Sequence, residues 1–198
     1  MTRRAVASRL ELLDECGVRV VRGLGHPAVV DHGLATLSRV TDHSDGWLVL
    51  GLGGAAVCPG SRQRWLAATG RIAIVELASR AIKRAVPRDR PRLKGMPPLA
   101  PTPSPRSFPS SHTAAAVAAV SAFDGLLPAW ALRLLAATTA FSRLYLGVHY
   151  PSDVAAGAML GRALGGRGRS RPPLVTGPLR TRRARGSGPR RRGRRSGP

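Results

Sequence analysis

Three short stretches of the sequence place ionisable side chains beside segments rich in Ala, Gly and Leu. The first runs from Lys83 to Pro91, the second is "PSSH" at 109–112, and the third is "SRLYLGVHYPSD" at 142–153. Each stretch lies at the end of a predicted helix. Burying a charged side chain beside an apolar segment costs free energy unless that charge is paired or binds a ligand. We therefore expect the three stretches to meet in one site.

The cationic residues of these stretches suit the binding of a tetrahedral dianion. Lys83 supplies a point charge, and Arg90 and Arg143 each supply a rigid, forked guanidinium. The helix predicted to begin near Ser110 adds backbone N–H donors and the positive end of its dipole. Together these groups predict a phosphate site.

Two histidines and one aspartate supply the remaining parts of a phosphoryl transfer. His149 and Asp153 are four residues apart, so the carboxylate can accept a hydrogen bond from one ring nitrogen and leave the other lone pair facing the anion. An oriented neutral imidazole is a competent nucleophile. His112, at the start of another predicted helix, can protonate the departing oxygen as a general acid. The pattern therefore predicts nucleophilic catalysis at phosphorus.

In chain order the stretches read KxxxxxxRP, PSxH and SRxxxxxHxxxD, which resembles the signature of the type 2 phosphatidic acid phosphatase (PAP2) family. That family includes bacterial lipid phosphatases and shares its active site with acid phosphatases and vanadium haloperoxidases. The resemblance implies that His149 forms a phosphohistidine, that Asp153 orients it and that His112 is the acid. It implies no metal and no other cofactor.

The resemblance also implies a set of phosphate-binding residues, which are Lys83, Arg90, Ser110, Ser111 and Arg143. Ser111 departs from the family pattern, which usually has Gly at this position. A Gly lets its backbone N–H approach the phosphate closely, and Ser keeps that N–H but adds a side chain. The departure affects the detailed geometry of the site.

The helices that position these residues are predicted from apolar segments bounded by Pro, Gly and Ser. Residues 4–22 have the spacing of an amphipathic helix that lies on a surface. A Pro-rich, basic loop is expected over 87–109. The remaining helices are expected over 47–58, 65–82, 111–127, 129–147 and from Pro151 to 166.

Two architectures accommodate these helices. The two helices after Ser110 and Pro128, of roughly 17 residues each, would extend about 26 Å, against the ~30 Å of a bilayer core. The alternative is a soluble bundle with small-residue packing. An Ala- and Gly-rich chain with only 4% aromatic residues suits close packing in lipid. We predict an all-α integral membrane bundle of four to five spanning helices, with a PAP2-like site at the extracytoplasmic helix ends.

The chain divides into three predicted segments. Residues 1–46 form an N-terminal amphipathic or interfacial segment, 47–166 a PAP2-like membrane phosphatase domain and 167–198 a disordered tail with twelve arginines and no acidic residue. The positive-inside rule places this tail in the cytoplasm of a bacterium and the catalytic face outside its plasma membrane. We expect the tail to bind anionic lipids and not nucleic acid, because the body of the chain has no RNA-binding signature.

The side of the N-terminus stays open at this stage. Either residues 4–22 lie on the outer surface, or residues 23–46 include a poorly apolar crossing or a re-entrant segment. Gly157, Gly161 and Gly165 recur at every fourth position of the last predicted helix. This spacing permits close approach to a neighbour, either within the chain or in a homodimer.

The other polar groups have mainly structural interpretations. Glu76 and Arg80, four residues apart, can pair on one helix face. His26, His32 and His43 lie near acidic residues, as metal ligands do, but solvated loop and cap positions are favoured for them.

We predict a membrane phosphatase that acts on a phosphomonoester or diphosphate of a lipid. Polyprenyl diphosphate, a polyprenyl-phosphoryl sugar phosphate and phosphatidate are all compatible with the sequence. Two alternatives belong to other classes of protein: a vanadium-dependent haloperoxidase, which is typically larger and soluble, and a non-catalytic membrane adaptor that uses the basic tail.

Overall fold

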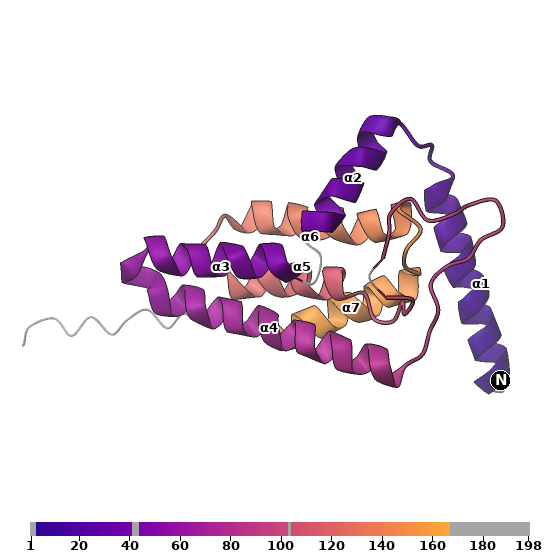
Figure 1. The fold of residues 1–198 in the computed structure, drawn as a ribbon. Coiled ribbons are helices and arrows are strands. Elements are labelled where there is room, and N and C mark those ends of the chain that lie inside the picture. Colours follow the sequence, from indigo (N-terminus) through magenta and orange to yellow (C-terminus); the bar gives the residue numbers. More distant parts are fainter. Residues whose placement is uncertain (1–2, 41–43, 103, 167–198) are drawn as a thin grey trace, which may run out of the picture. The chain divides into compact units, whose positions relative to one another are not determined.

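The computed structural model describes residues 3–40, 44–102 and 104–166, which Figure 1 shows as a helical assembly. These ranges contain a short 3₁₀ turn, η2 (Pro59–Ser61), and seven α-helices: α1 (Arg3–Arg22), α2 (Ala28–Val40), α3 (Asp45–Val57), α4 (Arg62–Ala85), α5 (Ser111–Ala122), α6 (Ala129–Tyr145) and α7 (Pro151–Leu164). The only β pairings within them are isolated bridges. The all-α prediction is confirmed. The predicted Arg-rich tail, 167–198, lies outside the described residues.

The helices begin where local sequence signals predict. The side chain of Ser110, in an extended backbone conformation, accepts a hydrogen bond from the N–H of Thr113 and caps α5. Proline precedes α6 at Pro128 and opens α7 at Pro151, where the missing N–H costs no helical bond. The predicted end of α5 was too late, because the chain turns after Ala122 and Gly125 has φ +67°.

Two parts of the fold differ from the predicted elements. α4 extends three residues further at each end than expected, so that Lys83 lies in its last turn. α2 occupies the region that the sequence left open as a crossing or a re-entrant segment. The amphipathic helix expected over 4–22 is confirmed as α1.

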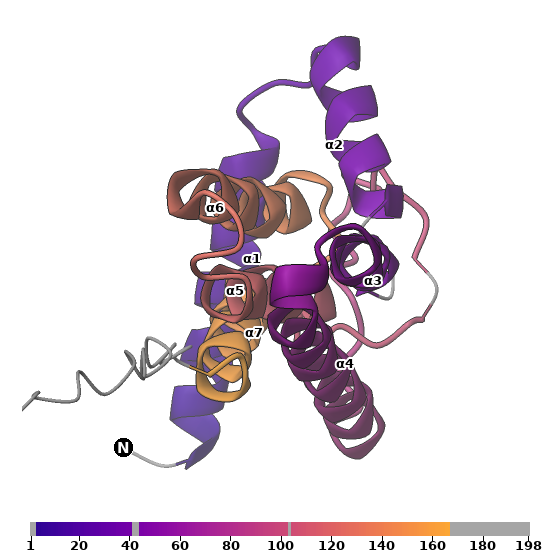
Figure 2. The same cartoon turned by 90° about the vertical axis from the view of Figure 1, so that its left-hand side faces the viewer.

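α5 is the central helix of the described fold. It contacts α4, α6 and α7, and in Figure 2 it lies between α6 and α7 with α4 beside it. Its buried face consists almost entirely of alanine, and Ala114, Ala116, Ala118 and Ala119 are inaccessible to solvent. Small side chains let the neighbouring backbones approach closely, so the ends of these helices are held in fixed relative positions.

The glycine stripe of α7 packs against α5 of the same chain. A Cβ atom added at Gly157 would collide with the carbonyl oxygen of Ser110, and one at Gly161 would collide with that of Ala114. At Gly165 the added atom would lie 2.7 Å from the Cα of Ala118. Of the two alternatives for this spacing, the described structure shows close approach within the chain, because α5 occupies this face. The homodimer stays a prediction.

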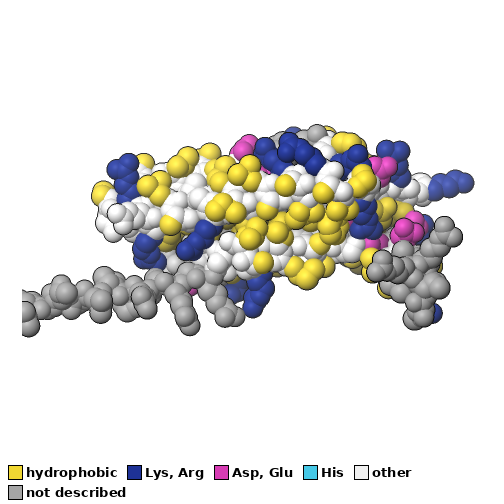
Figure 3. All heavy atoms as spheres, turned by 90° about the horizontal axis from the view of Figure 1, so that it is seen from below, with side chains coloured by type: hydrophobic (Ala, Val, Ile, Leu, Met, Phe, Trp, Pro, Cys, Tyr) yellow, Lys and Arg dark blue, Asp and Glu magenta, His cyan; other side chains and the backbone are white. Residues whose placement is uncertain are grey.

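Many large apolar side chains lie on the outside of the helices. Figure 3 shows hydrophobic side chains spread across the middle of one face of the molecule. The exposed ones include Val49, Leu52, Val57, Ile74, Leu77, Trp130, Leu134 and Met159. Within the described ranges, none of the helices combines the length and the apolar character needed to cross a bilayer. The four to five spans therefore stay a prediction.

The packing of α7 on α5 gives a testable prediction about stability. Gly161→Ala places a methyl group against the Ala114 carbonyl and should lower the free energy of unfolding by ~1–3 kcal/mol. Gly70→Ala on α4, where an added Cβ meets nothing within 4 Å, should raise it by ~0.5–1 kcal/mol. Urea unfolding in detergent, followed by circular dichroism, measures both. A Gly161→Ala protein as stable as Gly70→Ala would contradict this packing.

Candidate active site

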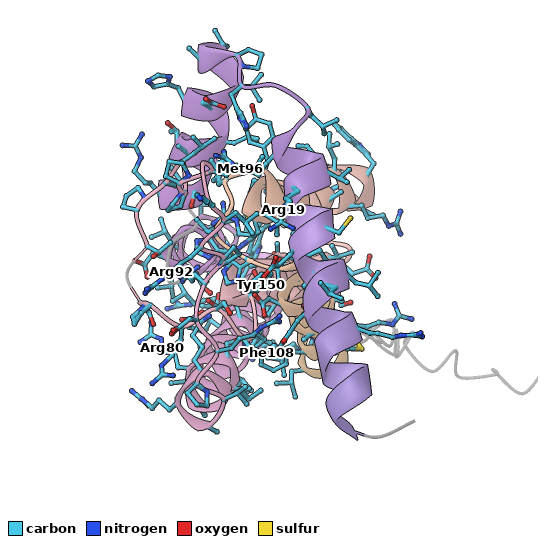
Figure 4. The ribbon with its side chains drawn as sticks, turned by 90° about the vertical axis from the view of Figure 1, so that its right-hand side faces the viewer. Arg19, Arg80, Arg92, Met96, Phe108 and Tyr150 are labelled. Carbon is cyan, nitrogen blue, oxygen red and sulfur yellow. The ribbon has the colours of Figure 1, made fainter. Side chains whose placement is uncertain are left out.

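The three polar stretches meet on the wall of one cavity of about 680 Å³. The cavity lies where the end of α4, the start of α5, the end of α6 and the loop before α7 converge. Figure 4 looks onto this end of the molecule with α1 in front and Tyr150 near the centre of the view. Six predicted site residues line the cavity, namely Lys83, Arg90, Ser111, His112, Arg143 and His149.

His149 is buried, at 1% exposure, and its two ring nitrogens face different groups. Nε2 lies 3.2 Å from Nη1 of Arg90, and Nδ1 lies 3.5 Å from Oδ2 of Asp153. A guanidinium can only donate, so Nε2 is the acceptor and the ring proton belongs on Nδ1, toward the carboxylate. The distance to Asp153 is at the outer limit of a hydrogen bond. The carboxylate therefore attracts the Nδ1–H group of the ring through a long contact.

The site keeps His149 neutral. Burial, helped by the positive charges of Arg90 and Lys83, lowers the pKa of His149 to about 3, although Asp153 opposes this shift. The imidazole therefore carries a lone pair on Nε2 at all pH values well above 3. This is the protonation state that a nucleophilic histidine requires.

Asp153 is completely buried and its carboxylate is held from two sides. Oδ2 accepts the backbone N–H of Tyr150 at 2.9 Å, which forms part of the cap of α7. Oδ1 accepts from Nη1 of Arg88 at 2.8 Å. The start of α7 thus fixes the carboxylate that faces His149.

Lys83 and Arg90 are held in place by carbonyl groups of the surrounding loops. Nζ of Lys83 donates to the carbonyl of Pro109 at 2.6 Å. Arg90 donates through Nε to the carbonyl of Ser104 at 2.7 Å and through Nη1 to that of Val148 at 2.8 Å. Burial, followed by the charge of Arg90, lowers the pKa of Lys83 to about 8.

Arg143 and His112 share a partner on α2. Arg143 is 2% exposed and donates to Oγ of Ser38 at 2.8 Å, and two of its nitrogens donate to Oγ of Ser142. Nε2 of His112 lies 3.3 Å from the carbonyl oxygen of Ser38. Ser38 is a site residue that the sequence did not reveal, because nothing in its neighbourhood distinguishes it from other helical serines.

The two serines of "PSSH" have different positions. Ser110 is fully buried, and its Oγ lies 3.0 Å from Oγ1 of Thr113, so its side chain serves the cap of α5 beside the cavity and not on its wall. Ser111, the first residue of α5, lines the cavity. The helix N-terminus therefore faces the site through Ser111, where the family pattern has Gly.

Arg88 and Asp14 are the main functional residues that sequence reasoning missed. Nη2 of Arg88 donates to Oδ2 of Asp14 at 2.6 Å, and the guanidinium carbon lies 4.3 Å from the ring centre of Tyr150. Oδ1 of Asp14 accepts the backbone N–H of Ser152 at 2.9 Å. The ion-paired series Asp14, Arg88, Asp153, in which both carboxylates are buried, thus attaches α1 to the start of α7.

Few features of the sequence indicate the contacts that join Asp14, Arg88 and Asp153. The loop "RDRP" contains two arginines, and only the family pattern singles out Arg90. Asp14 was one acidic residue among several on an amphipathic helix. A buried carboxylate such as Asp153, whose charge one neutral histidine cannot compensate, implies a cationic partner, and this requirement points to Arg88.

The structure describes most of the polar residues for which the sequence favoured structural roles. Nε of Arg80 donates to Oε1 of Glu76 at 2.8 Å, which confirms the predicted pair. His26 lies near Asp31 and the carbonyl of Arg22, and His32 contacts the carbonyl of Ala28. His43 lies outside the described residues, and no group of three metal-binding side chains gathers within the ranges that are described.

Several known proteins resemble this chain in sequence. The model of the PAP2 superfamily matches residues 64–170. Decaprenylphosphoryl-5-phosphoribose phosphatase of Mycolicibacterium smegmatis is 39% identical over 133 residues, which cover 67% of this chain and 73% of that protein. The protein of the same name from Mycobacterium tuberculosis is 41% identical over 133 residues, which cover 65% and 73%.

Two solved structures share the fold. The transmembrane PAP2-type phosphatidylglycerolphosphate phosphatase of Bacillus subtilis has a TM-score of 0.66 at 23% identity and covers 83% of this chain and 84% of its own. Aquifex aeolicus LpxE has a TM-score of 0.63 at 23% identity and covers 75% and 89%. The family match and the phosphatases among the relatives define a hydrolase of phosphoric esters. The chain belongs to the PAP2 superfamily.

The link from α1 to Asp153 gives a prediction about turnover. Asp14→Asn removes the charge that holds Arg88, so Asp153 loses part of its support and the His149 ring loses orientation. We expect kcat to fall about tenfold with little change in KM, because small displacements of reacting groups cost rate more than binding. Glu11→Gln, an exposed acidic residue on the same helix, is the matched control. Steady-state phosphate release measures both, and equal effects of the two changes would contradict the positioning role.

The pKa of Lys83 gives a prediction about pH. The ammonium group is lost as pH rises through about 8, so kcat/KM should fall above that pH as the free enzyme loses one phosphate-binding charge. Lys83→Arg keeps its charge and should move this alkaline limb to higher pH. Lys94→Arg, on an exposed turn, should leave it in place. A limb that is unchanged in Lys83→Arg would assign it to another group.

Proposed function

We propose that this protein is a membrane lipid phosphatase that removes the terminal phosphate of a polyprenyl-phosphoryl sugar phosphate through a phosphohistidine on His149. The observation that carries the proposal is the neutral His149 ring, with Nδ1 toward Asp153 and Nε2 on the wall of the cation-lined cavity. The names of the mycobacterial relatives support this substrate over phosphatidate or polyprenyl diphosphate.

The proposed reaction has two steps at phosphorus. Nε2 of His149 attacks the phosphorus atom as the bond to the leaving alkoxide breaks, and His112 gives that oxygen a proton. A water molecule then attacks the phosphohistidine, His112 takes its proton, and the nitrogen–phosphorus bond breaks to release phosphate. His112, held near the Ser38 carbonyl, lines the same cavity as His149.

Charge stabilisation comes from side chains in this proposal. Lys83, Arg90 and Arg143 bind the non-bridging oxygens, on which negative charge develops in the transition state. The N-terminal N–H groups of α5 at Ser111 add to this anion site. We propose that these donors suffice and that the reaction proceeds without a metal ion.

The proposed location is the plasma membrane of a bacterium, with the site on the extracytoplasmic side. The apolar side chains exposed on α3, α4, α6 and α7 support contact with lipid, because soluble proteins rarely expose so many together. The Bacillus subtilis phosphatase that shares this fold is a transmembrane protein, which also supports this location. The cytoplasmic tail that binds anionic lipids belongs to the same proposal and lies outside the described residues.

Replacing the nucleophile tests the mechanism directly. His149→Ala should lower the rate of phosphate release at least about 10³-fold in the presence of a chelator, because no other group supplies the attacking lone pair. His32→Ala, an exposed histidine on α2, is the matched control. Substrates are a short-chain polyprenyl-phosphoryl pentose phosphate, a polyprenyl diphosphate and phosphatidate. Rapid quenching with a ³²P-labelled substrate should trap label on the wild-type protein and not on His149→Ala.

The outcomes separate the parts of the proposal. Release that persists in His149→Ala would exclude the phosphohistidine. Loss of wild-type release on adding chelator, and its return with a divalent metal, would exclude metal independence. Faster hydrolysis of phosphatidate or of the diphosphate than of the pentose phosphate would replace the proposed substrate.

A further inference from the structure

The cavity carries more positive charge than a single phosphate requires. One carboxylate, that of Glu76, lies on its wall, against the following seven cationic side chains: Arg39, Arg80, Lys83, Arg84, Arg90, Arg106 and Arg143. Three of the seven, Lys83, Arg90 and Arg143, come from the recognised motifs. The other four are not explained by the binding of the phosphate that is cleaved.

Two of the remaining arginines line the cavity together with Lys83. Arg84 follows it in the last turn of α4. Arg106 precedes Ser107, whose carbonyl oxygen lies 3.4 Å from Nζ of Lys83. Arg84 and Arg106 therefore line the cavity from the end of α4 and from the Pro-rich loop, respectively.

The guanidinium groups of Arg84 and Arg106 have no ion pair and no hydrogen bond within the described ranges. Arg80 differs from them, because its charge is paired with Glu76 at 2.8 Å. Like charges that gather around a cavity without a compensating carboxylate repel one another, and an anion in the cavity relieves this repulsion. The cavity of about 680 Å³ is also within the usual range of about 300–1,000 Å³ for ligand sites and is far larger than a phosphate ion.

We propose that Arg84 and Arg106 form a second anion subsite, which binds a second phosphate of the lipid substrate while the first is cleaved at His149. This inference rests on the proposed function and narrows it to lipids that carry two phosphate groups. In a prenylphosphoryl-5-phosphoribose the 5-phosphate would occupy the catalytic subsite, and the phosphodiester that joins ribose to the prenyl chain would bind Arg84 and Arg106.

The rival ligand for these arginines is an anionic membrane surface. Arg84 is exposed and Arg106 is half-exposed, and both side chains line the same cavity as Lys83 and His149. A contact with a flat lipid surface would not require them to line this cavity. The geometry therefore favours the substrate, and the membrane surface becomes an outcome of the test.

A pair of substrates isolates the second phosphate. The first is a short-chain prenylphosphoryl-5-phosphoribose, and the second is an alkyl riboside 5-phosphate of matched chain length. Both lose the same 5-phosphate, and they differ in the phosphodiester. In neutral detergent micelles, Arg84→Gln and Arg106→Gln should each lower the ratio of kcat/KM for the first substrate to that for the second by about tenfold, the usual scale for one charge-assisted hydrogen bond. Arg92→Gln, an exposed arginine of the same loop that does not line the cavity, should leave this ratio unchanged.

Binding of the dephosphorylated compound tests the subsite without turnover. Short-chain prenylphosphoryl-ribose retains only the phosphodiester, and its Kd for the full chain in detergent should rise about tenfold in each variant. Unchanged ratios and an unchanged Kd would overturn the subsite, as would an effect that appears only when anionic lipid is added to the micelles. If wild-type protein hydrolyses neither substrate but binds prenylphosphoryl-ribose through these arginines, the proposed function fails and the subsite stands.

Discussion

The burial of the Asp153 carboxylate is the constraint on which the rest of the site depends. A buried charge needs partners, and Asp153 obtains them from the Tyr150 backbone, from Arg88 and from the facing His149 ring. The same carboxylate therefore begins α7, orients the imidazole and recruits a guanidinium. Through Arg88 it also recruits Asp14, so a helix outside the residues matched by the family model becomes part of the support of the site.

Close helix packing converts this local arrangement into a defined cavity. The alanine face of α5 and the glycine stripe of α7 bring two backbones together, which places His112 at the start of one helix near His149 before the other. α4 and α6 pack on α5 as well and carry Lys83 and Arg143 in their last turns. Since these candidate site residues sit at or next to the ends of packed helices, the site inherits the rigidity of the core.

The electrostatics of the cavity follow from the clustering of cationic side chains beside buried groups. Burial and neighbouring positive charge hold His149 neutral and bring the pKa of Lys83 down to about 8. A phosphate that binds in the cavity relieves the repulsion among the cationic side chains, because each of them can then pair with a negative charge. A site built in this way binds anions strongly and stabilises further negative charge as it develops, which is what phosphoryl transfer needs.

The sequence by itself determined the helical class, the starts of α5, α6 and α7 and six of the residues that line the cavity, because caps, prolines and motif spacing are local. It did not decide whether the glycine stripe of α7 packs within the chain, which serine of "PSSH" lines the cavity, or which arginine holds Asp153. Those outcomes depend on contacts between residues far apart in the chain, such as Arg88 with Asp14 and Arg143 with Ser38. Only tertiary packing selects among side chains whose local sequence signals are equal, because it determines which polar groups are buried together and must pair.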